Sequence, residues 1–101
     1  MIKLRLNKSE TVSFALLLKQ YLSQDDNYGK NTDLVLLTRF VIDEFFDKRL
    51  ETLAFPKDQN QFKVTPSVAF SILFMLTNMP LSSTSYELVI ANKVISIIQR
   101  Q

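Results

Sequence analysis

The sequence predicts a mainly α-helical fold in which four helices form two repeated strand–helix–helix units. Residues 12–18 (VSFALLL) resemble residues 68–74 (VAFSILF), and residues 33–41 resemble residues 87–95 in the same way. In each half, these matches follow a short run of alternating polar and apolar residues and a helix-capping residue. A repeat of this kind predicts a pseudo-two-fold arrangement inside one chain, with chance similarity between apolar helices as the alternative.

Length and composition indicate two half-units that pack as one compact domain. The first unit is residues 1–55, the second is residues 61–101, and residues 56–60 form the linker. Each unit, at roughly 50 residues, is near the smallest size that can bury a core alone. Because 47% of the residues are hydrophobic and only one is glycine, we expect the units to bury each other and the chain to form a homo-oligomer.

The first unit begins with a strand and a capped helix. Residues 2–6 alternate between apolar and polar side chains, as a half-buried strand does. Asn7 lies three positions before Glu10, which is the spacing of a capping box and predicts a helix over residues 8–23.

The second helix of this unit follows a polar loop at residues 24–31. Asn31 or Thr32 is its expected N-cap. Apolar residues continue as far as Phe55, and Pro56 sets the limit of the helix.

The second unit repeats this order. Residues 61–65 alternate as residues 2–6 do, which predicts a second short strand. Thr65 is a suitable N-cap for a helix over residues 66–78, and Thr84 or Ser85 caps the last helix. Aligning the two units requires a two-residue deletion after the second strand.

The residue content argues against an enzyme. Histidine and cysteine are absent and there is one glycine, so the commonest general base, thiol nucleophiles and glycine-rich phosphate loops are missing. No catalytic residue and no cofactor are therefore expected. Three carboxylates lie four positions apart on the second helix: Asp43, Asp47 and Glu51. They could begin a metal site, but basic residues at i,i+4 spacing make an exposed, ion-paired helix face the preferred interpretation.

Charge and hydropathy limit the partners. The net charge of +2 permits an acidic partner without the strong basic excess of many nucleic-acid binders. The absence of cysteine is compatible with the cytoplasm, which is the expected location. The longest apolar stretch, residues 68–79, contains Ser71, Thr77 and Asn78, so no membrane span is expected.

The order strand, helix, loop, helix resembles the ribbon-helix-helix family of DNA-binding proteins. The resemblance covers residues 1–10, the helix through Leu22 and the opening of the second helix at residues 29–32, with a looser match over residues 61–101. In that family two units pair their strands into an antiparallel ribbon that enters the major groove. The resemblance therefore implies a short two-stranded antiparallel ribbon of residues 2–6 and 61–65, and double-stranded DNA as the partner.

Two sets of residues would then contact DNA. The outward side chains of the ribbon would contact base edges: Lys3, Arg5, Asn7, Gln61 and Lys63. The starts of the second helices would hold phosphates through Lys30, Thr32 and Thr84. The alternative for the ribbon is a solvated polar face, in which Lys3 and Arg5 only protect a strand edge from aggregation.

One departure from the family concerns the linker. If the second helix ends near Leu50, about ten residues are free to carry the chain to the second strand, but about five are free if it ends near Phe55. The longer helix would strain the connection, since an extended chain gains at most about 3.5 Å per residue.

Two functions follow from this sequence. The first is a small non-enzymatic DNA-binding protein that acts as a repressor or accessory factor. The alternative is a helical protein–protein interaction or self-associating domain that binds no nucleic acid. The large apolar residues belong to the core or to an oligomer interface in either case: Phe14, Leu18, Phe40, Phe45, Phe46, Phe70 and Phe74.

Overall fold

The computed structural model describes residues 2–23, 33–78 and 86–100. These residues are mainly helical, as predicted, and form two strands and five helices. In chain order the elements are β1 (Ile2–Asn7), α1 (Lys8–Ser23), α2 (Asp33–Lys48), α3 (Leu50–Ala54), β2 (Gln59–Val64), α4 (Pro66–Asn78) and α5 (Tyr86–Gln99).

The described residues contain five helices and not four because the helix predicted to reach Phe55 bends at Arg49. Arg49 has φ −111° and ψ 15°, outside the α region, although its N–H still donates to Phe45 O at 3.0 Å. The bend directs α3 against α1 and buries Leu53. Residues 55–58 are then enough to connect α3 to β2. A straight helix as far as Phe55 would have required a longer linker.

Local capping sets the starts of α1 and α4. Asn7 Oδ1 accepts the Glu10 N–H at 2.8 Å, and Glu10 Oε1 accepts the Asn7 N–H at 2.9 Å. This reciprocal pair is the predicted capping box. At α4, Thr65 Oγ1 accepts the Val68 N–H at 3.3 Å, which confirms Thr65 as the N-cap.

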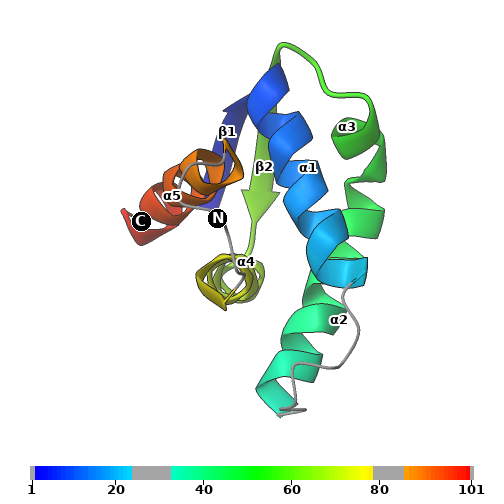
Figure 1. Ribbon diagram of the computed structural model, residues 1–101, viewed down its shortest axis with the longest axis vertical. Coiled ribbons are helices and arrows are strands. Elements are labelled where there is room, and N and C mark those ends of the chain that lie inside the picture. The colour runs from blue at the N-terminus through cyan, green and yellow to red at the C-terminus, as the bar shows by residue number, and fades with distance from the viewer. Residues whose placement is uncertain (1, 24–32, 79–85, 101) are drawn as a thin grey trace.

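The two strands pair as a short antiparallel ribbon (Figure 1). In the view of Figure 1 they run side by side between α5 and α1, and α4 is seen end-on near the arrow end of β2. The paired residues are Ile2 with Val64, Lys3 with Lys63, Leu4 with Phe62, Arg5 with Gln61, Leu6 with Asn60, and Asn7 with Gln59. The predicted ribbon is thus confirmed, with β2 beginning at Gln59, two residues earlier than expected.

One face of the ribbon forms part of the hydrophobic core. Leu4, Leu6, Phe62 and Val64 are at most 2% exposed. Phe62 also packs with Phe14 of α1 and Phe45 of α2, with the three ring centroids 6.2–6.4 Å apart. This aromatic cluster joins β2 to two helices and holds the opposite face of the ribbon toward solvent.

The helices of the two halves pack across each other. The first helix of one half, α1, packs on α5, the last helix of the other half, and also on α2 and α3 of its own half. In the same way, α4 packs mainly on α2. Each half therefore relies on the other for the burial of its helices.

The burial pattern corrects the alignment of the two halves. If Lys8 at the start of α1 is matched with Pro66 at the start of α4, buried Phe14 falls on buried Ile72. The two-residue deletion instead pairs Phe14, which is 0% exposed, with Phe70, which is 55% exposed. The alignment with the deletion thus pairs residues of unlike burial, whereas counting from the two helix starts pairs residues of like burial.

The predicted match between residues 33–41 and 87–95 also pairs residues of unlike burial. It places Phe40, 69% exposed, opposite Val94, 0% exposed. The match rested on the similarity of apolar residues, which does not show which face of each helix is buried.

Candidate nucleic-acid interface

The solvent-facing side of the ribbon gathers the predicted base-contacting residues on one surface. Alternation along the strands directs every second side chain outward. We call this surface the ribbon face; its six exposed residues are Lys3, Arg5, Asn7, Gln59, Gln61 and Lys63. The predicted set omitted Gln59, although Gln59 continues the alternation of Gln61 and Lys63.

Two lysines lie directly opposite each other on the ribbon face. Lys3 of β1 pairs with Lys63 of β2 in the register, and both are exposed. Like charges in this position destabilise a sheet. Because none of the six residues is acidic, an anionic partner would relieve this repulsion.

The central pair of the ribbon face is hydrogen-bonded. Arg5 Nε donates to Gln61 Oε1 at 3.2 Å across the strands. The guanidinium carries five N–H donors and no acceptor, so the remaining donors of Arg5 can turn outward. The glutamine thus limits the orientation of the guanidinium.

Asn7 has a structural task as well as an exposed position. Its Oδ1 accepts hydrogen bonds from the Glu10 N–H and from Ser9 Oγ, the latter at 3.2 Å. A bidentate contact with adenine requires both the oxygen and the nitrogen of an amide. Asn7 could make this contact only by giving up the cap of α1.

Asn60 belongs to β2, as Gln59 does, although both were expected in the linker over residues 56–60. It is 6% exposed, and its Oδ1 accepts the Lys57 N–H at 2.9 Å. Its Nδ2 donates to Thr11 Oγ1 at 3.0 Å and to Lys57 O at 2.8 Å. Asn60 therefore joins the start of β2 to α1 and helps to keep the ribbon in register.

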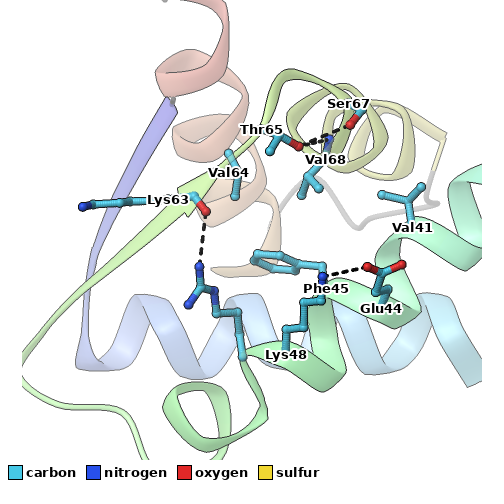
Figure 2. A pocket seen from close by; sticks show the side chains of 10 residues that line it. Val41, Glu44, Phe45, Lys48, Lys63, Val64, Thr65, Ser67 and Val68 are labelled. Carbon is cyan, nitrogen blue, oxygen red and sulfur yellow. Dashed lines mark hydrogen bonds and ion pairs between the residues drawn. The ribbon is translucent and has the colours of Figure 1, made fainter.

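A separate pocket of about 390 Å³ lies beside the end of β2 (Figure 2). Phe45, Val64 and Val68 give it an apolar lining. Figure 2 shows the Lys63 side chain directed away from these residues. The carbonyl oxygen of Lys63 accepts a hydrogen bond from Arg49 Nη2 at 3.4 Å. The pocket is thus distinct from the ribbon face.

Two of the three cations that line this pocket, Lys48 and Arg49, are already engaged. Lys48 Nζ lies 2.8 Å from Glu44 Oε1, an i,i+4 ion pair of the kind predicted for this helix face. Lys48 also lowers the pKa of the exposed Glu44 carboxyl. Arg49 donates to the backbone of β2, and this contact supports the bend between α2 and α3. These cations are therefore not free to bind a ligand in the pocket.

An ion pair connects α1 and α5 beside the ribbon. Lys93 Nζ donates to Glu10 Oε2, the carboxylate that also takes part in the capping box. Partial burial acts to raise the pKa of Glu10, but the hydrogen bonds from Lys93 and from the Asn7 N–H outweigh it and lower this pKa. The charged form of Glu10 therefore stabilises the folded chain.

Three further predictions concern the phosphate contacts, a metal site and a membrane span. The proposed phosphate contacts Lys30, Thr32 and Thr84 lie outside them. Within residues 2–23, 33–78 and 86–100, no group of three or more acidic side chains is arranged to hold a metal ion. In the same ranges no helix has the length and apolar character needed to cross a membrane.

Comparisons with protein families, curated proteins and solved structures gave no match to this chain. The chemistry of the ribbon face is thus the basis for a functional conclusion.

Proposed function

We propose that this chain is a small non-enzymatic DNA-binding protein that places the ribbon face in the major groove, as a repressor or an accessory factor. The observation that carries this proposal is the composition of the face. Three cations (Lys3, Arg5 and Lys63) and three amides point outward without a carboxylate among them. We also propose that the protein is located in the cytoplasm.

The dimensions and support of the ribbon favour this use. The major groove of B-DNA admits a two-stranded ribbon, whose outward side chains can reach base edges. A two-stranded ribbon is only marginally stable alone. Here the buried side, with Leu4 and Phe62 at its centre, anchors the ribbon to the helices.

The crossed packing of α1 with α5 and of α4 with α2 supports the resemblance to the ribbon-helix-helix family. We infer that the two halves are repeated strand–helix–helix units, so that one chain takes the place of a dimer. The matching burial of Phe14 and Ile72, and the matching exposure of Val12 and Phe70, support this inference.

The test compares two charge-matched double variants in fluorescence-anisotropy titrations with a mixed duplex pool at about 50 mM salt. Arg5→Ala with Lys63→Ala removes two cations from the ribbon face and is expected to weaken binding by about tenfold or more. Lys19→Ala with Arg100→Ala removes two exposed cations elsewhere and is expected to change affinity much less. Equal losses in both variants would contradict the proposal.

A second candidate function is self-association, and exposed apolar residues favour it. Leu37 and Phe40 of α2 are 60% and 69% exposed, and Val12 and Val89 are 43% and 60% exposed. Exposed apolar surface of this kind marks many protein interfaces. In sedimentation velocity, Leu37→Ser with Phe40→Ser should then dissociate an oligomer of the parent chain, whereas a monomeric parent would remove the basis of this function.

A further inference from the structure

The ribbon face differs from a general polar surface in its balance of hydrogen-bond donors and acceptors. Lysine and arginine side chains only donate. The three amide oxygens of Asn7, Gln59 and Gln61 are therefore the only side-chain acceptors that the six residues carry.

Two of these three oxygens are already used. Gln61 Oε1 accepts from Arg5 Nε, and Asn7 Oδ1 accepts from the start of α1. Because arginine has no acceptor, the Gln61 amide must turn its oxygen toward Arg5 and its nitrogen away from it. The end at Lys3 and Lys63 therefore carries donors alone, and at the centre the one acceptor, Gln61 Oε1, already accepts from Arg5, so that this part of the face offers mainly donors.

We propose that this donor-rich part of the ribbon selects guanine in the major groove. This inference rests on the proposed function and specifies its partner as duplex DNA with guanine clusters. Guanine presents two acceptors, N7 and O6, to the major groove, whereas adenine sets an N6 donor beside its N7 and cytosine presents an N4 donor. Arg5, Lys3 and Lys63 can use both acceptors of guanine, whereas adenine offers one acceptor beside a donor, thymine one acceptor beside a methyl group, and cytosine a donor.

Gln61 acts as a positioning residue in this arrangement. Its hydrogen bond holds the guanidinium of Arg5. Its Nε2 group supplies donors that suit the same guanine acceptors as Arg5 does. At the other end of the face, Gln59 makes no side-chain hydrogen bond to the described residues and keeps its acceptor. One end of the face thus offers donors and the other keeps an acceptor. We therefore expect the preferred DNA sequence not to be palindromic.

The experiment measures the affinity of the full chain for three duplexes of equal length at one low salt concentration. The first contains guanine clusters, the second contains the same clusters with 7-deazaguanine, which lacks the N7 acceptor, and the third contains only A·T pairs. The guanine duplex is expected to bind about tenfold or more tightly than the A·T duplex. The 7-deazaguanine duplex is expected to lose most of this preference.

Two matched variants locate the effect. Gln61→Glu adds a negative charge and acceptors beside Arg5 and is expected to reduce the guanine preference, whereas Gln59→Glu makes the same change at the other end and should reduce it less. Equal binding to all three duplexes would overturn the inference and leave DNA binding standing. Absence of binding to any duplex would overturn both the inference and the proposed function.

Discussion

At the residue scale, one buried amide links the ribbon to the first helix. Asn60 points toward the core side of β2, where an apolar residue is expected from the strand pattern. Its hydrogen bonds to Lys57 and Thr11 satisfy the amide. Thr11 Oγ1 in turn donates to Asn7 O at 2.8 Å, so that the chain of hydrogen bonds reaches the N-cap of α1.

Replacing this amide should destabilise the fold. Asn60→Ala leaves Thr11 and the Lys57 N–H without their partner in a buried setting, which is expected to cost about 1–3 kcal/mol in the free energy of unfolding. The measurement is urea denaturation followed by circular dichroism. The neighbouring exposed substitution Gln59→Ala should change stability by less than about 0.5 kcal/mol; similar losses in the two variants would refute the role given to Asn60.

The carboxylate of Glu10 makes stability depend on pH. Its pKa is lower in the folded chain than in the unfolded chain, so the charged form stabilises the fold above the unfolded value of about 4.3. This contribution is lost as the pH falls through the folded pKa. Glu10→Gln is therefore expected to be less stable than the parent chain at pH 7, by about 0.5–1 kcal/mol, and to match it more closely near pH 3.

The same denaturation series on Glu44→Gln provides the control. Glu44 forms an exposed pair with Lys48 on one helix, so its removal should have a smaller effect than the loss of the link between α1 and α5. A stability difference for Glu10→Gln that does not shrink in acid would show that the carboxylate charge is unimportant.

At the element scale, α1 and α4 start from different caps but bury corresponding positions. Phe14, Leu17 and Leu18 of α1 are buried, and the corresponding residues of α4, counted from each helix start, are buried too: Ile72, Met75 and Leu76. Both helices thus turn the same face to the core, although their residue types differ. Burial is a better guide to this correspondence than similarity of apolar letters.

Two identical substitutions test the correspondence. Phe14→Ala removes a ring from the aromatic cluster and is expected to cost about 3–5 kcal/mol. Phe70→Ala, which the uncorrected alignment treats as the equivalent change, affects a half-exposed ring and should cost less than about 1 kcal/mol. Thermal or urea unfolding compares them, and equal costs would support the uncorrected alignment.

Elements that depend on local chemistry were predictable from the sequence. Asn7 with Glu10, and Thr65 before Pro66, mark helix starts because a side-chain oxygen satisfies a free backbone N–H. The bend at Arg49 was not predictable in this way, since neither proline nor glycine is present there. It depends on the burial of Leu53 against α1, which is a tertiary effect.

At the scale of the whole molecule, the two halves form one core through exchanged helix contacts. Helices of each half pack on helices of the other, because α4 packs mainly on α2, and α1 packs on α5 as well as on α2 and α3 of its own half. Composition predicted the mutual burial, alternation predicted the two strands, and the family resemblance predicted their antiparallel pairing. The sequence could not reveal that the amide of Gln61 is engaged by Arg5, because that contact depends on the strand register.

The central claim is that the ribbon face is the DNA-binding surface, and chemical-shift mapping tests it most directly. The isotope-labelled chain is titrated with a mixed-sequence duplex at about 50 mM salt. We predict that the largest shifts fall on the backbone and side-chain signals of Lys3, Arg5, Gln61 and Lys63. Shifts confined to Val12, Leu37 or Val89, or no shifts at all, would contradict the claim and direct attention to the exposed apolar surface.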